Sequence, residues 1–310
     1  MHLSVVSPVY QGEKTVTELM RRLVSAISPL TQDFEIILVD DGSKDHSWKI
    51  IQDLAQQESR IKALQFSRNF GQHHALTAGL DICQGDWVVM MDCDLQDRPE
   101  EVPRLYAKAK EGFDVVVARR GKRKDGLLKK FCNWAFYKIF NFLTGMQYDP
   151  QVGGFRIMSK KVVIALRTMR EQHRFINGLI HWMGFRTASV DTEHAARLDG
   201  KSTYTFIKLL KFSLEIITSY SEKPLKISAL IGFIIALLAF AFGVAIFIKA
   251  FFYGTPVSGW SSLIISLYFL SGVMMMVLGV LGIYLGKVLS EVKNRPLYVI
   301  SHAIGVDTSK

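Results

Sequence analysis

Hydrophobic and polar positions in the first third of the chain form blocks of two kinds. Short apolar runs of strand length alternate with amphipathic stretches of helix length. The apolar runs predict β-strands at Leu3–Ser7, Glu35–Val39, Ile61–Phe66, Trp87–Met91 and Phe113–Ala118. The amphipathic stretches predict helices at Glu13–Ser28, His46–Glu58, His73–Cys83 and Pro99–Glu111. This βαβα alternation predicts an α/β fold with a mainly parallel sheet covered by helices.

Two long uncharged apolar runs, 227–248 and 261–286, follow in the last third of the chain. A helix needs about 20 apolar residues to cross the hydrocarbon core of a bilayer, so each run predicts a transmembrane helix. Two buried helices of a soluble domain are the alternative. Lysine and arginine side chains flank the outer ends of the pair, and the positive-inside bias then puts both ends in the cytoplasm.

These patterns predict a cytoplasmic domain that is anchored by a hairpin of two membrane helices. The expected parts are a cytoplasmic domain at 1–202, a juxtamembrane amphipathic helix at 203–225, the two spans within 226–286 and a cytoplasmic tail at 287–310. Residues 127–143 are basic and aromatic, which is typical of a helix at the membrane surface or of a helix packed on the sheet. No signal peptide is expected, because the first ten residues read as a short strand interrupted by Pro8.

Charge and composition narrow the range of partners. The 310 residues are 49% hydrophobic and carry a net charge of +10, which indicates an anionic partner such as nucleic acid, anionic lipid or a phosphorylated substrate. Residues 119–130, RRGKRKDGLLKK, account for +6 of that charge, and residues 226–310 account for +4. Because the charge is local and flanks the apolar helices, we expect membrane lipids and a lipid phosphate rather than nucleic acid. The three cysteines are scattered, which argues against a disulfide scaffold.

A pair of carboxylates ends the fourth predicted strand. Ligands of parallel α/β sheets bind beyond the carboxyl ends of the strands, and Asp92 and Asp94 occupy such an end in WVVMMDCDLQD. Together with Gln96 they supply the hard oxygen ligands that Mg²⁺ or Mn²⁺ prefers, and a metal there would neutralise a diphosphate. A solvated turn is the alternative for such a short motif.

A second acidic pair, Asp40 and Asp41, follows the second predicted strand. Its carboxylates can accept hydrogen bonds from a nucleobase or a ribose. The alternative is a plain turn between strand and helix, in which Ser43 or Asp45 caps the helix. No GxGxxG follows the first strand and no GxxxxGK[ST] occurs, which argues against a dinucleotide-binding dehydrogenase and a P-loop enzyme.

The motifs SVVSPVY, ILVDDGSKD, FSRNFGQHHALTAGL and MDCDLQDRPEEVPRL, in this order, resemble those of family 2 glycosyltransferases with the GT-A fold. GGFRIMSKKVV, ARLDGKSTY and a two-span tail ending in GIYLGKVLSEVKNRPLY are similar to the polyprenyl-phosphate glycosyltransferases, the GtrB-like, ArnC-like and dolichyl-phosphate mannose synthase group. The resemblance covers roughly residues 3 to 300. It implies a GT-A domain, a mainly parallel sheet with helices on both faces, plus a C-terminal transmembrane hairpin.

The same resemblance implies an activity and a location. A sugar would pass, with inversion, from a nucleotide-diphosphate sugar to a polyprenyl phosphate (undecaprenyl or dolichyl) in the presence of Mg²⁺ or Mn²⁺. The enzyme would be a multi-pass protein of the inner membrane, a homo-oligomer that the resemblance makes a tetramer, with both termini in the cytoplasm. A processive polysaccharide synthase is an alternative, but its usual Q-x-x-R-W motif is missing here. A catalytically silent relative that only binds nucleotide sugar or lipid is another.

The resemblance also implies roles for individual residues. The nucleotide-sugar pocket would contain Pro8, Val9, Tyr10, Glu13, Asp41, Arg68 and Asp92. The metal and the diphosphate would be held by Asp92, Asp94 and Gln96. The catalytic set would be Asp94, Arg119, Arg197 and Ser202, and the acceptor phosphate and lipid would meet Arg119, Lys129 and Lys130.

Two departures from the family pattern affect these expectations. Gln11 and Gly12 stand where Asn-Glu is usual, which leaves Glu13 alone to support that part of the pocket. Many relatives read GDFRL where this chain reads GGFRI, so the Asp often proposed as the catalytic base is replaced by Gly154. A phosphate acceptor, with a second pKa of ~6, is already ionised and needs positioning more than deprotonation. Asp149 is an alternative helper, or a turn residue before a proline.

Overall fold

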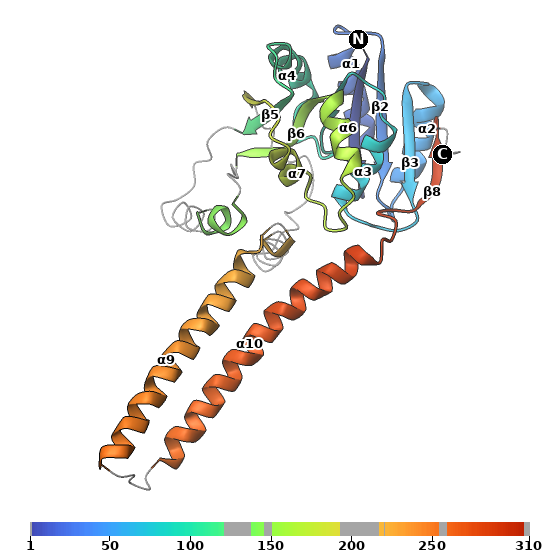
Figure 1. The fold of residues 1–310 in the computed structure, drawn as a ribbon. Helices are drawn as coiled ribbons and strands as arrows, with labels where there is room; N and C mark the ends of the chain where they lie inside the picture. Colours follow the sequence, from blue (N-terminus) through green and yellow to red (C-terminus); the bar gives the residue numbers. More distant parts are fainter. Residues whose placement is uncertain are drawn as a thin grey trace. The chain divides into compact units, whose positions relative to one another are not determined.

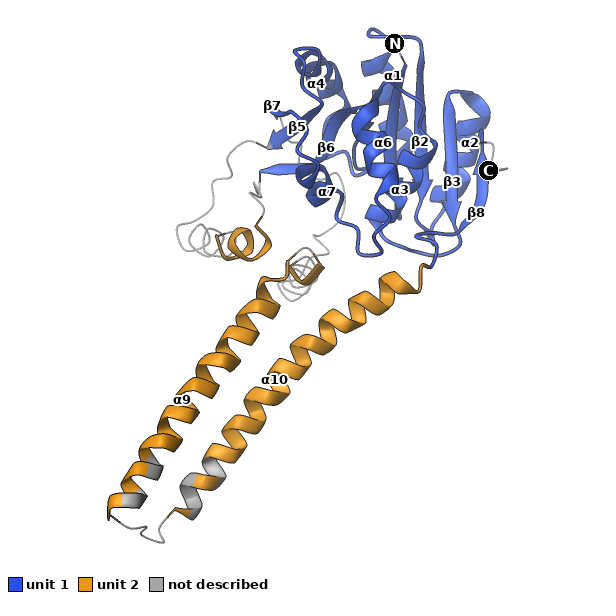
Figure 2. Cartoon of the chain, in the orientation of Figure 1, with its two compact units in different colours: residues 1–137, 146–203, 295–310 blue, residues 138–145, 204–294 orange. Residues whose placement is uncertain are grey.

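The computed structural model describes residues 2–120, 138–145, 151–192, 217–219, 221–253 and 259–306. The chain forms two compact units, which are coloured separately in Figure 2. Unit 1 comprises residues 1–137, 146–203 and 295–310, and unit 2 comprises residues 138–145 and 204–294. Unit 1 contains the sheet, and unit 2 contains the long apolar helices.

An eight-stranded mixed sheet, in the order β7-β5-β6-β4-β1-β2-β3-β8, forms the centre of the described part of unit 1 (Figure 1). Its strands are β1 (Leu3–Val9), β2 (Phe34–Asp40), β3 (Ile61–Phe66), β4 (Trp87–Met90), β5 (Val115–Arg120), β6 (Val152–Ser159), β7 (Thr187–Thr192) and β8 (Ile300–Ile304). The pairs among β1 to β4 are parallel, as is β5 with β7, whereas β6 and β8 pair with antiparallel neighbours. The strands and the mainly parallel sheet expected from the sequence are confirmed.

Helices cover both faces of this sheet (Figure 1). The helices of unit 1 are α1 (Val16–Ile27), α2 (Ser47–Gln57), α3 (Gln72–Ile82), the 3-10 turn η1 (Pro99–Glu101), α4 (Val102–Ala109), α6 (Lys160–Thr168) and α7 (Ile176–Trp182). Helix α1 contacts α2 and α4 on one face, while α3 contacts α6 and α6 contacts α7 on the other. The predicted helices are therefore confirmed within a few residues at each end.

Strand β1 is buried along its whole length because both of its faces are covered. Leu3, Val5 and Val9, whose side chains share one face of β1, belong to the core that includes α1. Val6, on the other face, points toward α3. A Cβ atom at Gly79 of α3 would lie 2.3 Å from Cγ1 of Val6, so only glycine allows α3 to approach the sheet this closely. Burial on two faces explains why apolar residues of this strand occur at adjacent positions, such as Val5 and Val6, instead of only at alternate ones.

Two strands depart from the sequence-based expectation. Strand β6 was expected only as a motif, because its glycines break the β pattern, yet it runs antiparallel between β4 and β5. Residues 300–304 were expected in a tail that begins at 287, but they form β8 at the edge of the sheet. Helix α10 also continues to Val292, past the predicted end of the span. Part of the expected tail thus belongs to unit 1.

Unit 2 contains two long helices, α9 (Lys223–Tyr253) and α10 (Trp260–Val292), which contact each other (Figure 2). Within them, Lys223–Ala245 and Ser266–Val292 have mean hydropathies of 2.6 and 2.1 and are almost entirely exposed. A water-soluble protein would bury such surfaces. Both helices are long and apolar enough to cross a membrane, in agreement with the two expected spans.

A short helix at 138–144 packs within unit 2 and is the described part of the basic, aromatic stretch 127–143. The ammonium group of Lys223 donates to the carbonyl oxygen of Phe142 and lies 4.6 Å from its ring centroid. Ile139 and Phe142 are exposed by 60% and 64%. These contacts place residues 138–145 against the start of α9, and the expected helix at the membrane surface stays a prediction.

A buried carboxylate joins the strands at the end of the sheet opposite to the acidic pairs. Glu35 of β2 is 3% exposed and accepts hydrogen bonds from the Ser4 hydroxyl at 2.5 Å and the Gln84 backbone N–H at 2.6 Å. The Lys62 ammonium lies 2.6 Å from its second oxygen. Burial alone raises the pKa of Glu35, but the hydrogen bonds from Lys62, Ser4 and Gln84 outweigh it and hold the pKa below the ordinary value.

We therefore expect Glu35→Gln to lower the free energy of unfolding by about 2 kcal/mol at pH 7, because buried acceptors are lost. A depressed folded-state pKa stabilises above the unfolded pKa and loses its effect as the pH falls through the folded pKa. The difference between wild type and variant should thus shrink below about pH 4.5. Thermal unfolding of the full chain in detergent at several pH values measures this. Glu18→Gln, which removes only an exposed ion pair with Arg21, is the control and should leave the midpoint unchanged.

Candidate functional site

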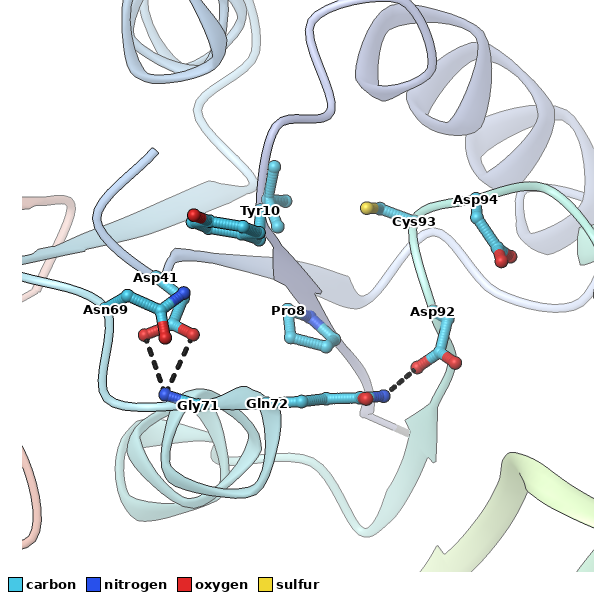
Figure 3. A pocket seen from close by; sticks show the side chains of 10 residues that line it. Pro8, Tyr10, Asp41, Asn69, Gly71, Gln72, Asp92, Cys93 and Asp94 are labelled. Carbon is cyan, nitrogen blue, oxygen red and sulfur yellow. Dashed lines mark hydrogen bonds between the residues drawn. The ribbon is translucent and has the colours of Figure 1, made fainter. Parts of the chain in front are cut away.

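A cavity of about 350 Å³ opens where β1, β2 and β4 end and α3 begins (Figure 3). The parallel register pairs Val9 of β1 with Asp40 of β2 and brings the strand ends to one edge. The cavity is lined by Pro8, Val9, Tyr10, Asp41, Asn69, Gly71, Gln72, Asp92, Cys93 and Asp94. The structure therefore brings together six of the residues expected from the sequence: Pro8, Val9, Tyr10, Asp41, Asp92 and Asp94.

Asp41 forms one end of the cavity and holds its wall in place. Its carboxylate, in a residue only 3% exposed, accepts the backbone N–H of Phe70 at 2.7 Å and that of Gly71 at 2.9 Å. Figure 3 draws the bonds to Gly71. Burial raises the pKa of Asp41 although these amides favour the charged form. A Cβ atom at Gly42 would lie 2.5 Å from the backbone of Arg68, and its φ is +66°, so the turn requires glycine.

The turn that was the alternative for this acidic pair is also present. The Asp40 carboxylate accepts the Ser43 backbone N–H at 3.3 Å, and the Asp45 carboxylate accepts the Ser47 backbone N–H at 3.1 Å at the start of α2. Asp41, in contrast, faces the cavity. The segment therefore forms both a local turn and one end of the pocket.

Asp92 and Asp94 form the other end of the cavity. The Gln72 side-chain amide donates to Oδ1 of Asp92 at 2.6 Å, which orients that carboxylate (Figure 3). The Gln96 backbone N–H donates to Oδ1 of Asp94 at 3.1 Å across a tight turn in which Leu95 has a φ of +58°. Gln96 thus supports Asp94 through its main chain, and its side chain is not among those that line the cavity.

These two carboxylates suit a hard divalent cation that keeps most of its other ligands from water or phosphate. Among the described residues, no group of three or more His, Cys, Asp or Glu side chains could hold a metal. Mg²⁺ is commonly bound by one or two carboxylates together with water and substrate phosphates, so a pair that opens into a cavity fits it. Burial raises the pKa of the Cys93 thiol to about 11, so this thiol stays protonated and is a poor ligand.

Strand β6 brings Gly154 to face Asp92. A Cβ atom at Gly154 would lie 3.7 and 3.8 Å from the two carboxylate oxygens of Asp92. The guanidinium group of Arg156, which is 2% exposed, donates to the carbonyl oxygens of Gly153 and Gly154 at 2.8 and 3.2 Å and to Oδ1 of Asn177 at 2.6 Å. The main chain opposite Asp92 is therefore fixed by a buried arginine that the sequence analysis did not single out.

Several expected site residues lie away from the cavity lining. The Glu13 carboxylate accepts the His46 backbone N–H at 3.1 Å. The Arg68 guanidinium lies 4.0 Å from the Phe70 ring centroid. Arg119 pairs with Val152 between β5 and β6. Their binding roles stay predictions, as do those of Arg197, Ser202, Lys129 and Lys130, which lie outside the described residues together with Asp149.

The cavity also includes residues that sequence reasoning did not assign. Asn69, Gln72 and Cys93 line it, and all three fall inside motifs that carried the family resemblance. No pattern in the sequence indicated that Gln72 would reach Asp92, twenty positions away. His73, in contrast, packs edge-on against Phe175 with ring centroids 5.7 Å apart, and burial lowers its pKa to about 4, which agrees with a packing role.

The sequence of this chain is similar to the sequences of known glycosyltransferases. The model of the family "Glycosyl transferase family 2" matches residues 4–167. The chain is 40% identical over 308 residues to an uncharacterized glycosyltransferase of Synechocystis sp., covering 99% of this chain and 97% of that one. It is 39% identical over 302 residues to the bactoprenol glucosyl transferase of Shigella phage SfII, covering 97% of both.

A third relative acts on a different sugar. The chain is 33% identical over 307 residues to the undecaprenyl-phosphate 4-deoxy-4-formamido-L-arabinose transferase of Proteus mirabilis, with 98% of this chain and 94% of that protein covered. The family match spans more than half of the chain, and the relatives match almost from end to end. The chain therefore belongs to glycosyl transferase family 2.

Proposed function

We propose that this protein transfers a sugar, with inversion, from a nucleotide-diphosphate sugar to a polyprenyl phosphate at the cytoplasmic face of the membrane. The observation that carries the proposal is a single cavity with Asp41 at one end and the Asp92–Asp94 pair at the other. Two relatives of nearly full-length similarity are named for bactoprenol and undecaprenyl phosphate but for different sugars. We therefore propose polyprenyl phosphate as the acceptor class. The donor sugar differs between these relatives and has to be identified by experiment.

The geometry suggests how the donor lies in the cavity. The nucleoside would lie between Tyr10 and the Asp41 end, where a buried carboxylate and main-chain groups are available for hydrogen bonding. The diphosphate would lie at Asp92 and Asp94, where Mg²⁺ or Mn²⁺ would be held. When bound, such a cation neutralises the charge that develops on the diphosphate leaving group. Gln72 keeps the Asp92 carboxylate turned in a defined direction.

The acceptor needs positive charge more than it needs a base. A phosphate monoester has a second pKa of ~6, so at neutral pH its oxygen is ionised and nucleophilic. Two anions must then approach each other, and cations have to offset their repulsion. Arg119, Lys129 and Lys130 are proposed to hold the acceptor phosphate, and Arg197 and Ser202 to cover the diphosphate. The glycine at 154 is compatible with this chemistry.

The proposal also includes the membrane arrangement. Helices α9 and α10 would cross the bilayer as a hairpin, with unit 1 and both termini in the cytoplasm, and the copies would assemble as a homo-oligomer, a tetramer by family resemblance. An acceptor with a polyprenyl tail resides in the membrane, so an anchored domain meets it at the surface. The anchored geometry raises the encounter rate of enzyme and lipid by confining both to one plane.

The activity is tested directly with the purified full chain. We expect lipid-linked sugar to form from one of a panel of UDP-, GDP- and dTDP-sugars when undecaprenyl phosphate and Mn²⁺ or Mg²⁺ are present, as measured by extraction of labelled lipid. When the lipid is omitted or replaced by free sugar phosphates, little of the labelled sugar should be released from the nucleotide. Nucleotide binding without lipid product from any donor would contradict the proposal and favour a silent binding protein.

The metal assignment is tested by Asp94→Asn. We expect kcat/KM to fall roughly 100-fold or more, because the diphosphate loses charge neutralisation in the transition state. The apparent Mn²⁺ concentration for half-maximal rate should rise, since one anionic ligand is gone. Asp53→Asn, the same change at an exposed position of α2, is the matched control and should behave as wild type. An unchanged metal dependence in Asp94→Asn would refute the assignment.

The role of position 154 is tested by Gly154→Asp, with the uncharged Gly154→Asn as its control. The Cβ atom of the new side chain would lie 3.7 Å from a carboxylate oxygen of Asp92, and a second negative charge beside Asp92 raises its pKa. We therefore expect no gain in kcat and an acid limb of the pH–rate profile that moves to higher pH. A rise in kcat of roughly tenfold over Gly154→Asn would instead mean that the native site lacks a base it needs.

A further inference from the structure

The chain that follows α10 returns to unit 1 beside the cavity. Residues 295–304 include β8, which pairs antiparallel with β3, and the Ser67 backbone N–H donates to the Val299 carbonyl oxygen at 3.0 Å. Residues 67–72, which follow β3, carry Asn69, Gly71 and Gln72 of the cavity lining, and we call them the cavity wall. The C-terminal segment therefore runs along the outer side of the cavity wall.

A row of aromatic contacts connects this segment with the interior of the cavity. The Tyr298 ring stacks on Phe66 with centroids 5.1 Å apart and an interplanar angle of 11°. Phe66 meets Phe70 edge-on at 5.6 Å. The Phe70 backbone N–H in turn donates to the Asp41 carboxylate at 2.7 Å. The cavity wall is thus held from inside by Asp41 and from outside by Tyr298.

Tyr298 is itself fixed by a second set of contacts. Its hydroxyl donates to Oδ2 of Asp81 in α3 at 2.6 Å, and Arg170 binds both oxygens of that carboxylate at 2.8 and 2.9 Å. Burial raises the pKa of Tyr298, so the phenol keeps the proton it donates. The Gln172 side-chain amide donates to the Arg295 carbonyl oxygen at 2.6 Å. The Tyr298–Asp81 bond ties the returning chain to α3, the helix whose first residue is Gln72, and the Gln172 bond ties it to the segment after α6.

We propose that Tyr298 is a positioning residue for the nucleotide site and that the segment 295–304 is a structural part of that site. By packing on Phe66, the ring keeps the cavity wall where the Phe70 and Gly71 amides meet Asp41 and where Gln72 meets Asp92. Both ends of the cavity then depend on the chain that follows the second apolar helix. This inference rests on the proposed function only in assuming that the cavity takes a nucleoside diphosphate.

The test compares three variants of the full chain in detergent. Tyr298→Leu removes the stacked ring and the hydroxyl, Tyr298→Phe removes the hydroxyl alone, and Tyr106→Leu removes a ring that lies edge-on to Trp87 at the far end of β4. We expect Tyr298→Leu to speed hydrogen exchange at the Phe70 and Gly71 amides and to raise the Kd for a nucleoside diphosphate roughly three- to tenfold. The KM for the lipid acceptor should stay unchanged, and Tyr298→Phe should recover most of the binding.

The control variant, Tyr106→Leu, separates a positioning role of Tyr298 from a general loss of stability. Equal exchange rates in the cavity wall for Tyr298→Leu and Tyr106→Leu, or a Kd that differs from wild type by less than twofold, would overturn the inference. If Tyr298→Leu does not fold, Tyr298→Met, which also removes the stacked ring but keeps more of its volume, must show the same changes, and their absence would overturn the inference. UDP, GDP and dTDP with Mn²⁺ are the binding probes. If the wild type binds none of them, the proposed function is contradicted. The hydrogen-exchange rates at Phe70 and Gly71 would still test whether Tyr298 positions the cavity wall.

Discussion

The site depends on one buried carboxylate and the two main-chain amides that it binds. A buried carboxylate without hydrogen-bond donors is costly, so Asp41 can remain at the end of β2 only with the Phe70 and Gly71 amides in place. Those amides belong to the chain between β3 and α3, which means that Asp41 also determines where α3 begins. Gln72 is the first residue of α3 and reaches Asp92. One hydrogen-bonding requirement therefore links the two ends of the cavity.

Much of the fold can be predicted from short-range sequence patterns. The strands and contacts that were not predicted share a physical cause. Strands buried on both faces, such as β1 and β2, are mostly apolar, and the acidic pairs that follow β2 and β4 mark the site. Strand β6 contains adjacent glycines and β8 is a short edge strand, so neither has a pattern that stands above a loop. The contact of Gln72 with Asp92 and the stack of Tyr298 on Phe66 depend on tertiary structure. No local pattern encodes such partners.

The surroundings of Asp92 agree with a charged nucleophile. Gln72 binds one of its oxygens, and Gly154 leaves the opposite side open instead of adding a second carboxylate there. A hydroxyl acceptor would need a base at such a place, whereas an acceptor phosphate brings its own negative charge. Relatives that read GDFRL carry a carboxylate at this place, and this chain lacks it. Under the proposed function, Gly154 therefore lowers the negative charge near the acceptor and donor phosphates.

The order of the elements bears on the arrangement in the membrane. The chain leaves unit 1 after β7, forms α9 and α10, and returns to the same sheet as β8. Strand β8 pairs with β3 and covers an edge that would otherwise expose unpaired main-chain groups. Strands β7 and β8 belong to one sheet, and this is the connectivity that the proposed hairpin of α9 and α10 requires. This support for the proposal comes from chain order and hydrogen bonding and does not depend on the flanking positive charges.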